Sequence, residues 1–125
     1  MILTDFDKKL TESNRIREKY PERVPVIVGK ARGSTLNDID KKKYLIPNDV
    51  TMGQFISIIR TRINISPDKA IFVFINNILP PTSSRMITLY EEMKNKDGFL
   101  YVYYNCESVF GNTQYVQAFK LLIKN

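Results

Sequence analysis

The stretch from Asp40 to Ile63 constrains the fold more than any other part of this chain. It opens with a short β-capable run, Lys43 to Ile46, which is followed by Pro47. Proline has no N–H to give to a sheet, so it favours a strand at the edge. We therefore predict an edge strand here, with backbone donors and acceptors left free.

A helix is predicted directly after this strand. Thr51 and Gln54 have the spacing of a capping box, in which each side chain bonds to the backbone N–H of the other residue. Apolar residues then recur at helical spacing, at Met52, Phe55, Ile58, Ile59 and Ile63. We expect this helix to pack across a sheet. The edge strand beside it would bind a peptide by adding a strand to the sheet.

Length and composition indicate one domain. The chain has 125 residues, of which 43% are hydrophobic, enough for a core. No apolar run approaches the roughly 20 residues of a transmembrane helix, and the N-terminus has no long apolar segment typical of a signal peptide. A single cysteine, Cys106, excludes an internal disulfide and fits a reducing compartment. We expect a cytoplasmic or nuclear protein.

The chain contains no histidine, which argues against an enzyme. Without histidine there is no common general base, no Cys-His or Ser-His nucleophile pair and little basis for a zinc site. There is also no Gly-rich phosphate loop, CxxC pair or EF-hand spacing. The carboxylate pairs Asp38/Asp40 and Glu91/Glu92 fit a loop and a solvated helix face. We predict no catalytic residue, no metal site and no cofactor.

The net charge of +6 is concentrated in the first half of the chain. Residues 1–63 hold 13 Lys and Arg against 8 Asp and Glu, whereas residues 64–125 hold 6 against 5. This excess fits a solvated basic surface, an acidic partner protein or an anionic membrane. Nucleic acid is disfavoured, because Lys41-Lys42-Lys43 is short and no basic signature is interleaved with aromatic residues.

The remaining segments complete an α+β pattern. We expect a polar helix over 5–19, stopped by Tyr20-Pro21, with Arg15, Arg17 and Lys19 facing water. Strands are expected over 23–30, 70–75, 78–79 and 99–104, and a further helix over 85–94. Pro25 suggests that the first strand is an edge or starts irregularly, and the apolar run 70–75 suggests a strand covered on both faces. The order predicts a ubiquitin-like β-grasp with helices on one face and an added N-terminal helical segment.

Several motifs in matching order closely resemble a known family. They are the segments 16–28, 40–47, 53–55, 76–77, 80–82, 98–101 and 107–111. The family is that of the ubiquitin-like autophagy modifiers, autophagy-related protein eight, which includes GABARAP and the microtubule-associated-protein light chains. The resemblance runs from about Phe6 to Gly111. It divides the chain into an N-terminal helical segment (1–22), a β-grasp domain (23–111) and a C-terminal extension (112–125).

The resemblance implies a modifier with no catalysis of its own. An autophagy cysteine protease would trim the chain after Gly111, which follows Phe110. Activating and conjugating enzymes would then join Gly111 to phosphatidylethanolamine, and the protein would move from the cytoplasm to autophagosomal membranes and cytoplasmic vesicles. The alternative is an unconjugated ubiquitin-like adaptor in vesicle traffic or microtubule association.

The resemblance also implies a groove for cargo receptors and adaptors that carry aromatic-x-x-aliphatic motifs. One pocket would be formed by Glu12, Ile16, Pro25, Lys43, Leu45 and Phe99. The other would be formed by Tyr44, Ile46, Pro47, Val50, Phe55 and Ile58. Lys41, Lys43 and Arg23 would attract the acidic residues that flank such motifs.

Two segments depart from the family pattern. The leading segment is short, so the first of two family helices is expected to shrink to a turn around 4–8. Fourteen residues, 112–125, follow the expected glycine. They fit a discarded propeptide, a segment whose Phe119-Lys120-Leu121-Leu122 occupies the groove, or an amphipathic helix that touches a membrane.

Overall fold

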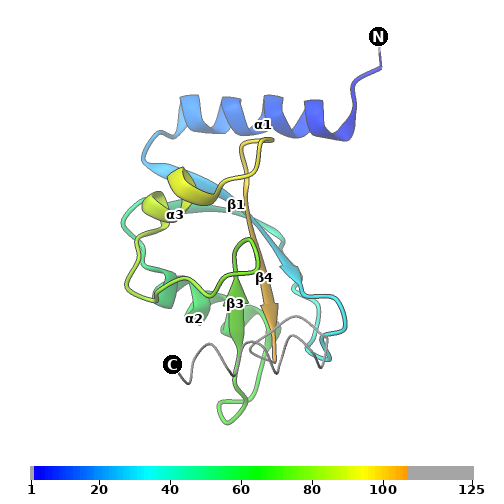
Figure 1. Cartoon of the computed structure of the whole chain (residues 1–125), viewed down its shortest axis with the longest axis vertical. Helices are drawn as coiled ribbons and strands as arrows, with labels where there is room; N and C mark the ends of the chain where they lie inside the picture. The colour runs from blue at the N-terminus through cyan, green and yellow to red at the C-terminus, as the bar shows by residue number, and fades with distance from the viewer. Residues whose placement is uncertain (1, 107–125) are drawn as a thin grey trace.

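A computed structural model of the chain describes residues 2–106. Its elements are α1 (Asp5–Lys19), β1 (Arg23–Lys30), β2 (Lys43–Pro47), α2 (Met52–Ile63), β3 (Phe72–Phe74), α3 (Met86–Met93) and β4 (Leu100–Asn105). The strands form one sheet in the order β2-β1-β4-β3 (Figure 1), with β1 parallel to β4 and the two outer pairs antiparallel. The α+β class and the predicted order of the main elements are confirmed.

The two strands that carry a proline differ in position. β2 lies at the edge of the sheet, as predicted, whereas β1 is an inner strand between β2 and β4. Of the two alternatives for Pro25, an edge position and an irregular start, the edge position is therefore wrong. Pro25 lies opposite Leu45 of β2, and pairing with β4 begins one residue later, at Val26 with Leu100. An inner strand tolerates this proline because no ladder partner faces its nitrogen.

The helix α2 has the predicted capping box. The Thr51 hydroxyl accepts from the Gln54 N–H at 3.2 Å, and the Gln54 side chain accepts from the Thr51 N–H at 2.9 Å. Four of the five predicted apolar residues are buried in the core, namely Met52, Phe55, Ile59 and Ile63. Ile58 was expected on the same buried face, but its relative exposure is 38%, so the prediction is only partly confirmed.

The apolar run at 70–75 forms less strand than predicted. Only Phe72–Phe74 pairs, on the outer side of β4, and Ala70 is exposed. The predicted returning strand at 78–79 is reduced to a single bridge between Ile75 and Ile78. Asn76 and Asn77 form the expected turn, both with positive φ. An apolar run therefore predicts which residues are buried better than it predicts which residues pair in the sheet.

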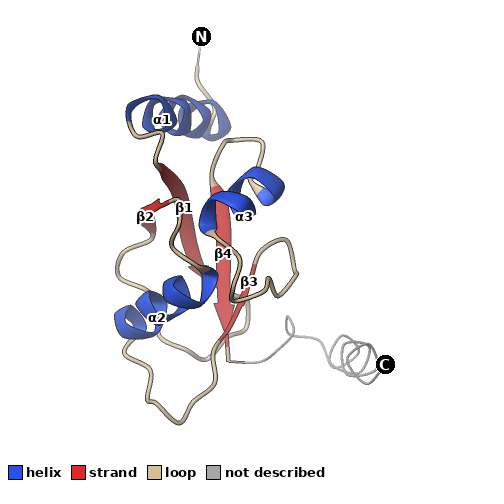
Figure 2. Cartoon of the chain, turned by 90° about the vertical axis from the view of Figure 1, so that its left-hand side faces the viewer, coloured by secondary structure: helices blue, strands red, loops and turns tan. Residues whose placement is uncertain are grey.

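The helix α1 is continuous from Asp5 to Lys19, so the expected turn around 4–8 is wrong. Thr4 caps it, and its hydroxyl accepts from the Asp7 N–H at 3.0 Å. Figures 1 and 2 place α1 across the end of the sheet where β1 and β4 begin. No helix within residues 2–106 is long and apolar enough to cross a membrane.

The helices α2 and α3 pack together against one face of the sheet, as predicted for the β-grasp. Tyr44 and Ile46 of β2 point into the core that contains α2 and α3. Side chains alternate along a strand, so Lys43 and Leu45 point to the opposite face. Lys43 meets Glu12 of α1 there, so the added N-terminal helix, which crosses the end of the sheet, also reaches that face.

Candidate functional site

The outer edge of β2 presents free backbone groups. The Val28 N–H donates to the Lys42 carbonyl at 2.8 Å, and the Asn48 N–H donates to the Glu22 carbonyl at 3.0 Å. These bonds fix the alternation along the antiparallel pair, so Tyr44 and Ile46 bond to β1. The N–H and C=O groups of Lys43 and Leu45 therefore point away from the sheet, where residues 2–106 supply no further strand.

A hollow of about 390 Å³ opens beside this edge, between α1 and β2. We call it the α1–β2 hollow. It is lined by Glu12, Ile16, Arg23, Pro25, Lys41, Lys43, Tyr44, Leu45 and Phe99. The structure thus brings together the whole set predicted for the first pocket, the two further cations expected at its rim, and Tyr44. Its apolar lining and basic rim suit an aromatic side chain followed or preceded by acidic residues.

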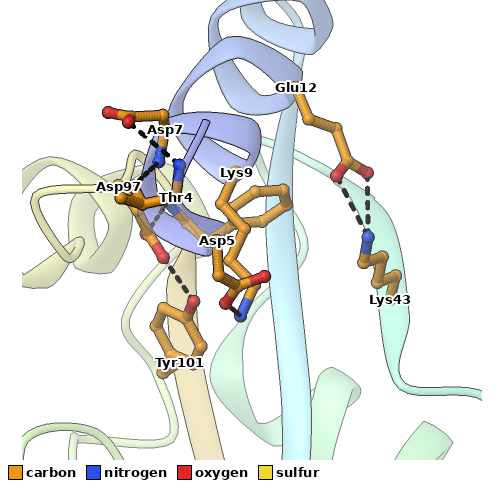
Figure 3. A network of polar contacts seen from close by, with 9 residues as sticks. Thr4, Asp5, Asp7, Lys9, Glu12, Lys43, Asp97 and Tyr101 are labelled. Atoms are coloured by element: carbon orange, nitrogen blue, oxygen red, sulfur yellow. Dashed lines mark hydrogen bonds and ion pairs between the residues drawn. The ribbon is translucent and has the colours of Figure 1, made fainter. Parts of the chain in front are cut away.

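An ion pair spans the α1–β2 hollow. The Lys43 ammonium lies 3.1 and 3.0 Å from the two carboxylate oxygens of Glu12 (Figure 3). The same ammonium lies 5.9 Å from the centre of the Phe99 ring, and Lys41 lies 5.0 Å from that of Tyr44. Each cation therefore rests on an aromatic ring, so the positive charge is held close to apolar surface.

Tyr44 connects the hollow to α2. Its ring meets the Phe55 ring edge-on at 5.7 Å, and its buried hydroxyl has no hydrogen-bond partner among the described residues. Burial raises the pKa of Tyr44, an effect that the nearby Arg62 guanidinium opposes. Arg62 donates to both carboxylate oxygens of Asp40 at 3.1 Å. This pair fixes the loop that carries Lys41 against α2.

The residues predicted for the second pocket are less open. Ile46 and Phe55 are core residues, and Val50 is half-buried against that core. Pro47 and Ile58 are exposed. A ligand side chain on this side of β2 would therefore meet Pro47, Val50 and Ile58 first.

The contacts that seat α1 were missed in the sequence, where Asp97-Gly98 indicated only a turn. The buried Ser13 hydroxyl donates to the Asp97 carbonyl at 2.6 Å. The Asp97 carboxylate accepts from the Phe99 N–H at 3.0 Å and from the Tyr101 hydroxyl (Figure 3). Burial, with help from this hydrogen bond, raises the pKa of Tyr101 to about 12. The one available signal was the sequence Asp97-Gly98-Phe99, in which an Asp side chain can accept from the N–H two residues later.

Arg17 also differs from its prediction. It was expected to face water, but it is half-buried and its NH1 group donates to the carbonyls of Pro21 and Arg23. It therefore holds the connection from α1 to β1. The predicted cleavage and conjugation residues, Phe110 and Gly111, lie outside the described residues, as does the whole segment 112–125.

Comparison with known proteins assigns the family. Residues 8–111 match the family described as "Autophagy protein Atg8 ubiquitin like". The chain is 59% identical over 106 residues to autophagy-related protein 8 of Schizosaccharomyces pombe, covering 85% of this chain and 88% of the relative. It is 56% identical over 107 residues to autophagy-related protein 8e of Arabidopsis thaliana, covering 86% and 88%.

Solved structures agree. A crystal structure of Trypanosoma brucei ATG8 superposes with a TM-score of 0.78 at 36% identity, over 86% of this chain and 93% of that one. Plasmodium falciparum Atg8, in complex with a P. falciparum Atg3 peptide, superposes with a TM-score of 0.79 at 37% identity, over 86% and 94%. These matches confirm the resemblance and the ubiquitin-like fold. The chain belongs to the Atg8 family of ubiquitin-like autophagy proteins.

Proposed function

We propose that this chain is a ubiquitin-like modifier of autophagy that performs no catalysis itself and binds partner proteins through the edge of β2. The observation that carries the proposal is the pairing of a free strand edge with an adjacent apolar hollow. Outward-facing backbone groups of Lys43 and Leu45 lie next to the α1–β2 hollow. An extended peptide gains main-chain hydrogen bonds from such an edge and specificity from the pocket.

The ligand would be an aromatic-x-x-aliphatic segment of a cargo receptor or adaptor. Its aromatic side chain would enter the α1–β2 hollow and lie against Ile16, Leu45 and Phe99. Its aliphatic side chain would bind on the other side of β2. Acidic residues beside the motif would meet Lys41 and Arg23, which affects mainly the association rate and selectivity.

The second half of the proposal is conjugation. An autophagy cysteine protease would cleave after Gly111, and the activating and conjugating enzymes of the pathway would join Gly111 to phosphatidylethanolamine. Cytoplasmic protein would thereby become bound to autophagosomal and vesicle membranes. The Plasmodium falciparum Atg8 structure, which contains an Atg3 peptide, supports a conjugating-enzyme partner for this chain as well.

Binding and conjugation are tested separately. For binding, a Trp-x-x-Leu peptide with acidic flanks is titrated into the protein, and Leu45→Ala should weaken it about tenfold, because Leu45 lines the hollow. The matched control is Ile78→Ala, a large apolar side chain that is 53% exposed and does not line this hollow. Equal affinities in both variants would contradict the site.

For conjugation, the full chain is incubated with an autophagy processing protease and its intact mass is measured. We expect a product that ends at Gly111. We expect no such product from a Gly111→Ala variant. An unchanged mass together with intact peptide binding would favour the unconjugated adaptor instead.

A further inference from the structure

A second hollow lies beside α1, separated from the α1–β2 hollow by the Ser13 contact. Glu12 and Ile16 line the first hollow, whereas Asn14 and Arg17 line the second. At 3.6 residues per turn these pairs form two stripes, with Ser13 between them and facing Asp97. The second hollow, which we call the α1–α3 hollow, measures about 590 Å³.

The floor of the α1–α3 hollow is rigid. Tyr90 of α3 is buried, and its hydroxyl donates to the Gly98 carbonyl at 2.6 Å. The Arg17 guanidinium lies 5.2 Å from the centre of the Tyr90 ring and is tied by NH1 to two carbonyls, those of Pro21 and Arg23. Its Nε and NH2 groups have no acceptor among the described residues. Arg17 lines the hollow, and two donors of its guanidinium are therefore available to a ligand.

Two further cations line the same hollow, Lys94 and Lys96. The Lys94 ammonium lies 5.1 Å from the Tyr90 ring centre, so its charge and that of Arg17 are no more than about 10 Å apart. That upper limit is about the Debye length at 0.1 M salt, so the two charges interact most strongly at low ionic strength. The two charges therefore repel each other, and an anion between them would relieve that repulsion.

Carboxylates do not neutralise these cations within residues 2–106. Lys9, Lys30, Lys43 and Arg62 each form a salt bridge there, whereas Arg17, Lys94 and Lys96 form none. Glu91 also lines the hollow, but it is not in salt-bridge contact with them. The described lining thus carries three positive charges against one negative charge.

We propose that the α1–α3 hollow binds a carboxylate-rich segment of a partner protein. The planar fork of Arg17 matches a carboxylate in a bidentate arrangement, and Lys94 and Lys96 would receive a second acidic side chain. The cations come from α1 and from the segment after α3, so a peptide with several carboxylates can meet them separately, which favours the peptide over a single phosphate. The α1–α3 hollow shares no lining residue with the α1–β2 hollow, so a partner can bind one of them while the other stays empty.

The test titrates a blocked tetraglutamate peptide into the full chain at low salt, following backbone amide NMR signals, with tetraglutamine as the neutral control. Shifts should concentrate on Asn14, Arg17, Tyr90 and Asn95. The double variant Lys94→Gln/Lys96→Gln should weaken binding about fivefold. Its matched control is Lys8→Gln/Lys42→Gln, which removes the same charge from exposed lysines that do not line the α1–α3 hollow.

Glu91 gives a test of opposite sign. Glu91→Gln should tighten tetraglutamate binding about twofold, whereas Glu92→Gln, the exposed neighbour that does not line the hollow, should have less effect. Equal losses in the two lysine double variants, shifts outside the α1–α3 hollow, or tighter binding of inorganic phosphate than of tetraglutamate would each overturn the proposal.

Discussion

Lys43 of β2 and Glu12 of α1 form a two-oxygen ion pair, with N–O distances of 3.0 and 3.1 Å, that joins the two walls of the α1–β2 hollow. Both side chains are partly exposed, so the pair adds little stability. Its larger effect is electrostatic, because Glu12 offsets a positive charge that would otherwise face an acidic ligand.

Removing this carboxylate should therefore improve binding. Glu12→Gln should bind an acidic-flanked aromatic-x-x-aliphatic peptide about threefold more tightly, measured by calorimetry at low salt. The gain should shrink at high salt, where surface charges are screened. Glu18→Gln, an exposed position on α1 that does not line the hollow, is the control. Weaker binding in Glu12→Gln would show that the pair shapes the pocket instead.

The seat of α1 depends on Gly98. Its φ is +86°, and an added Cβ would lie 2.8 Å from Ser13 Cβ and closer still to Ser13 Oγ. Gly98→Ala should lower the free energy of unfolding by about 2 kcal/mol, measured by urea denaturation.

Gly33→Ala is the matched control for this change. Gly33 has a similar φ of +81°, but nothing lies within 4 Å of an added Cβ. Only the backbone cost remains there, about 1 kcal/mol. Equal losses at both positions would mean that the Ser13 contact does not constrain the turn.

Alkaline pH should loosen the same region. The pKa of Tyr101 is raised to about 12 by burial and by the hydrogen bond to Asp97. A raised folded-state pKa favours the protonated phenol, so its contribution is complete below the ordinary tyrosine pKa near 10 and is lost as pH rises towards 12. Burial raises the pKa values of Tyr44, Tyr90 and Tyr104 in the same direction.

The measurement is the free energy of unfolding against pH over this alkaline range. Tyr101→Phe should reduce the slope, since it removes one of the four tyrosine hydroxyls whose pKa is raised while keeping the ring. Tyr103→Phe, at an exposed position, is the control for the loss of a tyrosine hydroxyl. A slope that Tyr101→Phe does not alter would contradict the Asp97–Tyr101 contact.

The capping box of α2 should contribute measurably to stability. Thr51→Ala removes the acceptor for the Gln54 N–H and should cost about 1 kcal/mol in urea denaturation. Thr88→Ala, at an exposed position in α3, should change stability by less than about 0.5 kcal/mol. A loss at Thr51 no larger than at Thr88 would mean that the cap is replaced by solvent.

Local signals predicted much of this fold. The Thr51/Gln54 box fixed the start of α2, and Pro47 indicated the edge position of β2 because both effects act through neighbouring backbone groups. Pro25 suggested a wrong edge position for β1, because a local signal does not show which strands pair. Whether a proline lies at an edge depends on which strand faces its nitrogen, and the pairing of β1 with β4 joins segments more than 70 residues apart.

For the site too, some residues could be predicted from the sequence and others could not. The resemblance named every residue of the α1–β2 hollow, because a matched motif carries tertiary information that periodicity lacks. The Ser13–Asp97 bond joins residues 84 positions apart, and no local pattern marks either one as a partner. Arg17 lies in a polar helix where a charged side chain is usually solvated, and its carbonyl partners are set by the turn that follows.

The most direct test of the proposed groove is backbone amide hydrogen exchange along β2, with and without a bound aromatic-x-x-aliphatic peptide. In the free protein the Tyr44 and Ile46 amides, which bond to β1, should exchange slowly, and the Lys43 and Leu45 amides should exchange fast. Peptide binding should protect Leu45, Lys43 or both, while Tyr44 and Ile46 remain protected. Saturating peptide that leaves both outward-facing amides in fast exchange would contradict strand addition at this edge.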